Sequence, residues 1–204
     1  MPARIKDIRG RISRARTSEK PVAKGSASPF SQGDLDSLWG VYSVINAARF
    51  LCPELGRHQS VSLFHVLGET LTSNRVTAQE TVSLGIEIPI VHALVESARN
   101  HLRDVLDLHI SSTTLTSKIH RFDDLWTALG EGLDQNQNQV AIIGLSGRHE
   151  HWTVAYRMTK KTIRLFDSDS MKVLLRSRCS LRSPRFPYQI DPAEIILIRR
   201  GGVR

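Results

Sequence analysis

The sequence is poor in the features that mark secreted and membrane proteins. It holds two cysteines in 204 residues, Cys52 and Cys179, and two cysteines so far apart do not form the disulfide framework of a small secreted domain. No apolar run approaches the roughly 18–20 residues of a transmembrane helix. No apolar segment follows the Arg-rich N-terminus, as it would in a secretory signal. We therefore expect a cytoplasmic protein without a membrane partner, and we expect no cofactor or bound metal.

Aromatic residues are also scarce, at 6% of the chain, whereas apolar residues make up 40% and charged residues 24%. These proportions are typical of a soluble globular protein. A chain of 204 residues is long enough for one domain with a core of its own and too short for two ordinary domains.

The net charge of +8 is concentrated at the two ends of the chain. Residues 1–24 hold eight Lys or Arg against Asp7 and Glu19, a net charge of +6, and residues 172–204 also carry a net +6. Residues 25–171 carry a net −4. Basic ends favour contact with nucleic acid or with an acidic partner. The alternative is a solvated extension, because no aromatic residue lies within 1–24 to stack on bases.

The composition of the chain changes at about residue 30. Residues 1–29 are rich in Arg, Ser, Ala and Lys and hold few large apolar residues, which predicts a flexible basic arm. Residues 30–200 form the predicted folded domain. The first helix in it is apolar on nearly every side, as in a helix buried in the core, and Asp34 or Asp36 is its candidate cap. Apolar spacing and end signals predict helices over residues 36–51, 61–71, 90–105 and 121–135.

Strands are predicted mainly in the second half of the chain. Residues 182–192 contain three prolines and predict an irregular connection. Helices followed by a run of antiparallel strands predict an α+β domain in two layers, with a helical layer packed on an antiparallel sheet. Apolar runs predict strands over residues 107–115, 139–147, 151–159, 161–169 and 194–200.

Two of these strands bring candidate catalytic residues together. His151 starts one strand and Asp167 lies at the end of the next, so antiparallel pairing places them side by side. A carboxylate next to a histidine fixes the imidazole tautomer and increases its basicity. Such a pair is the base half of a nucleophilic site. Asp169, two residues further along the chain, is an alternative partner for the histidine.

The start of the buried helix favours the other half of such a site. A thiol at a helix N-terminus has a lowered pKa because of the helix dipole and the unpaired N–H groups. A glutamine upstream can donate a hydrogen bond to an oxyanion, and Gln32 lies seven residues before that point. The residue at that point is Trp39, which has no nucleophilic group.

Three sequence blocks resemble those of papain-fold cysteine peptidases. The block QGDLDSLWGVYSVINA is similar to the Q-G-x-x-D-x-L-C-G-x-Y-x-x-x-N-A of their small bacterial homologues, and HWTV and LFDSD resemble the histidine and acid blocks. The similarity spans residues 30–200 and implies a papain-like fold. It also implies that Gln32 is the oxyanion-hole donor, His151 the general base and Asp167 the residue that orients it.

The resemblance also places Trp39 where the family has its nucleophilic cysteine, which argues against peptidase activity. Other nucleophiles fit poorly. Ser37 lies two residues before that position and faces another direction. Cys52 lies about 20 Å further along the helix at 1.5 Å per residue, and a buried structural role is typical of such a cysteine. No nucleophile motif surrounds Cys179.

These observations lead to one main hypothesis and two alternatives. The main hypothesis is an inactive peptidase homologue that binds a protein or peptide in the former substrate cleft, where Trp39 either fills the cleft or contacts the partner. One alternative is an active cysteine hydrolase with a relocated thiol. The other is an accessory protein that binds nucleic acid through residues 1–24 and 172–204, with a steep salt dependence.

Overall fold

The computed structural model describes residues 28–31, 38–77, 86–115, 118–133, 138–148 and 150–201. Most of the predicted basic arm lies outside these ranges, and so do Gln32 and Ser37. The division of the chain into an arm over 1–29 and a domain over 30–200 stays a prediction. In the described ranges, no helix combines the length and the apolar composition that crossing a membrane requires.

The helices and strands of the described residues form a mixed α+β structure, as the sequence predicts. The helices are α1 (Trp39–Leu51), α2 (Arg57–Ser73), α4 (Ile88–Leu106) and α5 (Phe122–Gly132), with short 3-10 turns η1 (Arg176–Arg178) and η2 (Pro192–Glu194). The strands are β1 (Ile110–Thr114), β2 (Gln139–Gly147), β3 (His151–Met158), β4 (Thr162–Leu165), β5 (Val173–Leu175), β6 (Cys179–Ser180), β7 (Tyr188–Gln189) and β8 (Ile195–Arg200).

The main sheet has the strand order β1-β8-β2-β3-β4-β5, and all of these neighbours are antiparallel. β6 and β7 form a small parallel pair, and β7 also pairs with the end of β2. The strand β7 lies inside residues 182–192, so the prediction of an irregular connection there is wrong in part. Two residues form a strand there because distant partners supply the hydrogen bonds.

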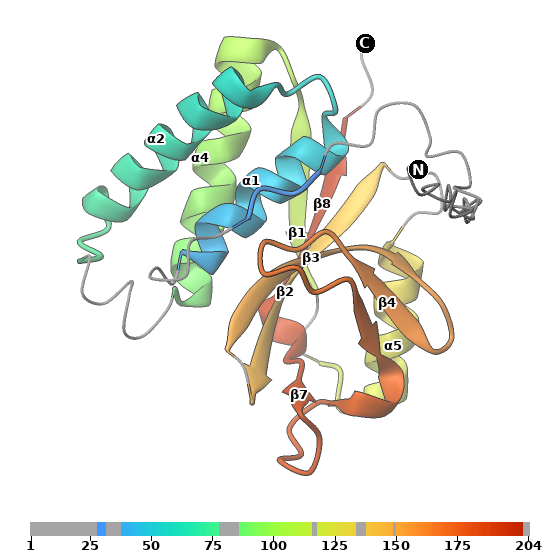
Figure 1. The fold of residues 1–204 in the computed structure, drawn as a ribbon. Coiled ribbons are helices and arrows are strands. Elements are labelled where there is room, and N and C mark those ends of the chain that lie inside the picture. The colour runs from blue at the N-terminus through green and yellow to red at the C-terminus, as the bar shows by residue number, and fades with distance from the viewer. Residues whose placement is uncertain are drawn as a thin grey trace, which may run out of the picture.

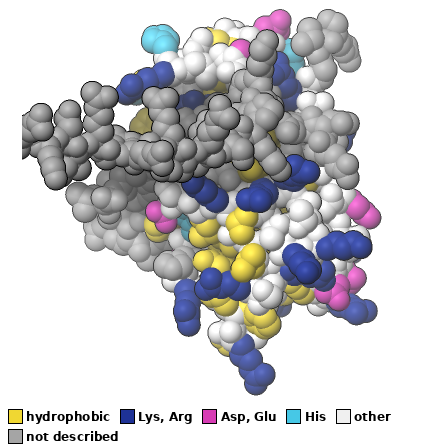
Figure 2. All heavy atoms as spheres, turned by 45° about the vertical axis from the view of Figure 1, so that its right-hand side comes forward, with side chains coloured by type: hydrophobic (Ala, Val, Ile, Leu, Met, Phe, Trp, Pro, Cys, Tyr) yellow, Lys and Arg dark blue, Asp and Glu magenta, His cyan; other side chains and the backbone are white. Residues whose placement is uncertain are grey.

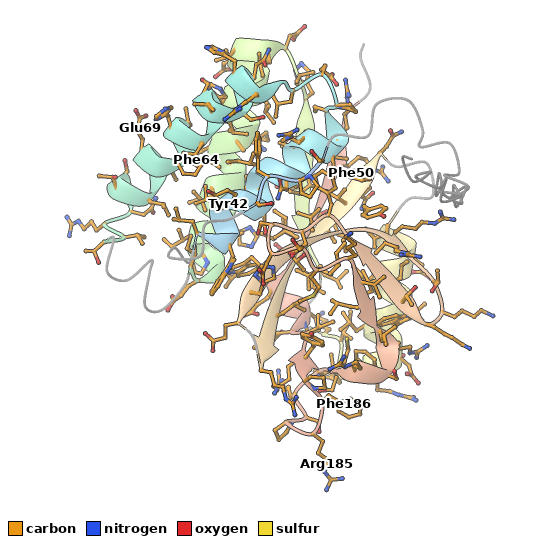
Figure 3. The ribbon with its side chains drawn as sticks, viewed as in Figure 1. Tyr42, Phe50, Phe64, Glu69, Arg185 and Phe186 are labelled. Atoms are coloured by element: carbon orange, nitrogen blue, oxygen red, sulfur yellow. The ribbon has the colours of Figure 1, made fainter. Side chains whose placement is uncertain are left out.

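Helix α1 lies between the other N-terminal helices and the sheet (Figure 1). It packs on β2, β3 and β8 and also contacts α2 and α4. Tyr42 of α1 meets Phe64 of α2 edge to face, with ring centroids 6.0 Å apart (Figure 3). Most of the helix is buried, as expected for a helix that is apolar on nearly every side. Its N-cap residue is Leu38, and the candidate caps Asp34 and Asp36 lie outside the described residues.

Helix α5 does not belong to the helical layer around α1. Its residues Leu125 and Leu129 pack in a cluster with Ile143 and Ile163, on the face of the sheet opposite α1. The expectation of two segregated layers is therefore wrong for this helix. The central strand β2 is consequently covered on both faces, and this explains why its sequence is an almost unbroken apolar run.

Candidate functional site

The first residue of β3, His151, is hydrogen-bonded to Asp167. His151 Nε2 lies 2.6 Å from Asp167 Oδ1, and both side chains are almost fully buried. Ala155 of β3 pairs with Leu165, the last residue of β4. The chain that follows β4 therefore runs alongside the start of β3, where His151 lies. The structure thus brings together the two residues that strand pairing predicts to be neighbours. The catalytic roles assigned to them stay predictions.

The carboxylate of Asp167 is held by further hydrogen bonds. Its Oδ2 accepts from the backbone N–H of Asp169 at 2.9 Å and of Met171 at 3.0 Å. Burial raises the pKa of Asp167, but the hydrogen bond and charge of His151 and the bond from Met171 outweigh it, so the pKa lies below its ordinary value. An ionised carboxylate only accepts hydrogen bonds, so His151 Nε2–H donates to Asp167. Asp169 supports Asp167 through its backbone and does not replace it.

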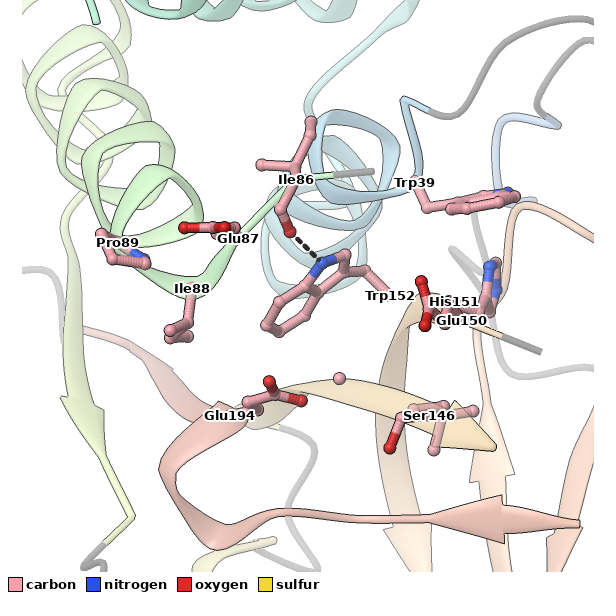
Figure 4. Close-up of a pocket in the computed structure, with 12 residues that line it drawn as sticks. Trp39, Ile86, Glu87, Ile88, Pro89, Ser146, Glu150, His151, Trp152 and Glu194 are labelled. Atoms are coloured by element: carbon pink, nitrogen blue, oxygen red, sulfur yellow. Dashed lines mark hydrogen bonds between the residues drawn. The ribbon is translucent and has the colours of Figure 1, made fainter. Parts of the chain in front are cut away.

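Trp39, the first residue of α1, lies against the imidazole of His151. The two ring centroids are 5.6 Å apart, and the ring planes meet at 75°, which is an edge-to-face arrangement. The indole is half-buried. The start of the buried helix therefore faces the histidine of the His–Asp pair, and an indole occupies the helix side of this contact (Figure 4).

Side-chain hydrogen bonds fix the elements around this contact. Ser43 Oγ of α1 donates to the backbone carbonyl of Trp152 in β3 at 2.7 Å. Trp152 Nε1–H donates to the carbonyl of Ile86, just before α4, at 2.7 Å (Figure 4). Asn46, buried in α1, binds both backbone groups of Phe30, which comes two residues before Gln32. These bonds connect α1, β3, the start of α4 and the segment that leads to Gln32.

A cavity of about 500 Å³ adjoins Trp39 and His151. Figure 4 shows the indole of Trp152 between Ile86 and Glu194, with Trp39 near His151. Aromatic and aliphatic side chains with a few polar groups are typical of binding cavities. The lining residues are Trp39, Ile86, Glu87, Ile88, Pro89, Gly144, Leu145, Ser146, Glu150, His151, Trp152 and Glu194.

The charged side chains of this cavity are all acidic. Among the described residues, no Lys or Arg forms an ion pair with Glu87, Glu150 or Glu194. Burial raises the pKa of Glu194, and the charges of Asp191 and Glu150 raise it further. The cavity is thus a negative region in a chain with a net charge of +8.

Neither cysteine belongs to this site. Cys52 follows α1 at its far end, Cys179 lies in β6, and both are buried. Burial raises the pKa of each thiol to about 11. Ser146 lines the cavity, but within the described residues no hydrogen bond joins it to His151. No group of three His, Cys, Asp or Glu in the described ranges could hold a metal ion.

Sequence analysis missed the three glutamates, Trp152 and Asn46 as parts of the site. The sequence could have indicated Asn46, because a polar residue within a mostly apolar, buried helix needs a hydrogen-bond partner. It gave no such indication of the glutamates, since they come from three segments far apart in the chain. Gln32 lies outside the described residues, so its role stays a prediction. No protein-family model matches the chain, and no curated protein matches its sequence.

Proposed function

We propose that this protein is a catalytically inactive homologue of the papain-fold cysteine peptidases that binds a protein or peptide segment. The position of Trp39 carries this proposal. An indole lies at the start of a buried helix, against the imidazole of a buried His–Asp pair. In a Cys–His–Asp site that position holds the thiol, which transfers its proton to the imidazole and attacks the substrate.

The chemistry of this arrangement supports binding over catalysis. An indole N–H is only a hydrogen-bond donor and has no nucleophilic atom comparable to a thiolate. The His–Asp pair can still polarise a group in the cavity, but it cannot form a covalent acyl intermediate. The remaining property of the site is recognition, for which Trp is a common central residue in protein interfaces.

The lining of the cavity favours a peptide with a positively charged residue. Trp39, Trp152 and Ile88 offer apolar contact, and Glu87, Glu150 and Glu194 offer carboxylates without a cationic partner among the described residues. A Lys or Arg side chain brought between these carboxylates replaces mutual repulsion by attraction. The proposed partner is therefore a peptide segment with a basic side chain flanked by apolar residues.

The alternative of an active hydrolase with a relocated thiol has no observation in its favour. With a pKa of about 11, on the order of one thiol in ten thousand is ionised at pH 7. Neither sulfur lines the cavity beside His151. The alternative of nucleic-acid binding through residues 1–24 and 172–204 stays a prediction, and residues 1–24 lie outside the described ranges.

The site is tested by introducing the missing thiol as Trp39→Cys. If the His–Asp pair is that of a peptidase, alkylation by iodoacetamide remains fast down to about pH 5, because an imidazolium partner keeps the thiolate. The control is Val61→Cys, an exposed position on α2. Alkylation there should slow about tenfold for each pH unit below 8, since an ordinary thiol loses its thiolate. Adding His151→Gln to Trp39→Cys should restore that ordinary pH dependence.

Binding is tested by selecting a random peptide display library on the wild-type protein. We expect the selected peptides to contain Lys or Arg and to bind at least about tenfold more weakly to Glu150→Gln/Glu194→Gln. The matched control is Glu69→Gln/Glu131→Gln, which removes the same charge away from this cavity. Equal loss in both double variants, or ordinary alkylation of Trp39→Cys, contradicts the proposal.

A further inference from the structure

Strand β3 contains a β-bulge at Tyr156. Ala155 pairs with Leu165 and Arg157 pairs with Arg164, so Tyr156 is the extra residue on β3. The bulge is five residues along β3 from His151, which is about 17 Å at 3.3 Å per residue. A bulge bends its strand and changes the direction of a side chain.

The bulge places Tyr156 and Arg157 on the same face of the sheet. Tyr156 contacts Phe50 of α1, with ring centroids 4.9 Å apart, so it points toward the α1 face. Arg164 lies between Ile163 and Leu165, which both pack in the α5 cluster. Because side chains alternate along a strand, Arg164 and its cross-strand partner Arg157 also point toward the α1 face.

The two arginines form an unfavourable pair within the sheet. Both are exposed, and they lie directly opposite each other on neighbouring strands. Like charges in this arrangement destabilise a sheet. No carboxylate in the described ranges forms an ion pair with either arginine. The pair is therefore expected to destabilise the sheet, by an amount that solvent screening of two exposed charges limits.

Aromatic rings lie beside these arginines. Phe50 contacts Tyr156, and it meets Phe166 edge to face with centroids 5.5 Å apart. All three rings are half-buried. Figure 2 shows many Lys and Arg side chains on the face that it turns forward. We name Phe50, Tyr156, Arg157, Arg164 and Phe166 the arginine–aromatic patch.

We propose that the arginine–aromatic patch binds single-stranded nucleic acid. Guanidinium groups bind phosphates through paired hydrogen bonds, and aromatic rings stack on unpaired bases. Phe50, Tyr156 and Phe166 are half-buried, so the accessible part of each ring is what can stack. A duplex hides its base faces, and an acidic protein segment has no bases to stack. The patch is separate from the proposed peptide site, because none of its five residues lines the cavity beside His151.

The test uses the full chain and a fluorescein-labelled 12-nucleotide oligothymidylate, with binding followed by anisotropy between 50 and 250 mM KCl. The variant is R157T/R164T, since threonine is compatible with strands. We expect the variant to bind about tenfold more weakly at 150 mM salt. The slope of log K against log salt concentration should also be smaller in magnitude by about 1.4, because each of two lost phosphate contacts contributes about 0.7. The unfolding midpoint of the variant should not fall, because the like-charged pair is gone.

The matched control is R182T/R185T, which removes the same charge from the loop before β7; Figure 3 shows Arg185 far from Phe50. This variant should bind the oligonucleotide about as well as the wild type. Equal loss in both variants means that only net charge matters and overturns the proposal. The proposal is also overturned if R157T/R164T binds the oligonucleotide as well as the wild type, because other basic residues would then be responsible for the binding. Absence of wild-type binding, or equal binding of the corresponding duplex or of heparin, overturns it as well.

Discussion

Replacing Asp167 perturbs the His–Asp pair directly, and the structure sets the size of the effect. The side chain of Asp167 is fully buried and accepts hydrogen bonds from His151 Nε2 and from the N–H groups of Asp169 and Met171. Asp167→Ala leaves three donors without an acceptor. Each buried unpaired donor costs about 1–3 kcal/mol, and the two backbone donors are only partly buried, so their cost lies at the lower end of this range. We therefore expect the free energy of unfolding to fall by about 3–5 kcal/mol.

Asp167→Asn should cost much less. The amide oxygen can accept from the N–H groups of Asp169 and Met171. The amide nitrogen can donate to His151 Nε2 once the imidazole proton moves to Nδ1. The hydrogen bonds thus survive, while the attraction between a carboxylate and the histidine is lost. We expect a loss of about 1–2 kcal/mol in the free energy of unfolding near neutral pH.

The loss of unfolding free energy in Asp167→Asn should depend on pH. The folded-state pKa of Asp167 is lowered, so its ionised form contributes stability that is complete above the unfolded pKa of about 3.9. That contribution is lost as the pH falls through the lower folded-state pKa. The Asn variant has no such contribution to lose. The deficit of Asp167→Asn relative to wild type should therefore shrink between pH 5 and pH 3.

Urea unfolding followed by tryptophan fluorescence measures these differences, provided that the slope of free energy against urea stays unchanged. Asp104→Asn is the control, because Asp104 is an exposed partner of Arg103 on α4, and its unfolding midpoint should equal that of the wild type. A cost below about 1 kcal/mol for Asp167→Ala refutes the reasoning about buried donors. A deficit of Asp167→Asn that does not change with pH refutes the reasoning about the lowered pKa.

Two further predictions concern the cysteines and the glycines. Burial raises the pKa of Cys52 and Cys179 to about 11. Alkylation of these thiols in the native protein at pH 8 should therefore be at least about 100-fold slower than in urea. Rapid labelling of either thiol in the native protein, located by peptide mass, would support a relocated nucleophile. Gly147 has a φ of +109°, and an added Cβ would lie 2.8 Å from the carbonyl oxygen of Pro187, so Gly147→Ala should destabilise by about 2 kcal/mol. Gly68, inside α2, has no atom within 4 Å of such a Cβ, so Gly68→Ala should stabilise by about 0.5–1 kcal/mol. Urea unfolding measures both glycine variants, and equal effects would contradict this reading of the backbone.

The candidate site was predictable where the signal lies in short stretches of chain. The apolar pattern after Leu38 predicted a buried helix, and the strand runs around His151 and Asp167 predicted neighbours in an antiparallel pair. Both features depend on residues close in sequence and on the pairing of consecutive strands. The helix cap at Leu38 and the strand β7 were not predictable in this way. For β7, hydrogen bonds to the distant strands β2 and β6 outweigh the local preference.

Local sequence patterns are enough to predict the α+β class, the burial of α1 and the proximity of His151 to Asp167, because side-chain periodicity and hairpin pairing are local properties. The packing of the whole chain is what places α5 on the second face of the sheet and pairs β1 with β8. It also brings three distant glutamates to the lining of one cavity. These features arise when segments far apart in the chain pack together, and the choice among alternative packings depends on the whole core rather than on any local pattern.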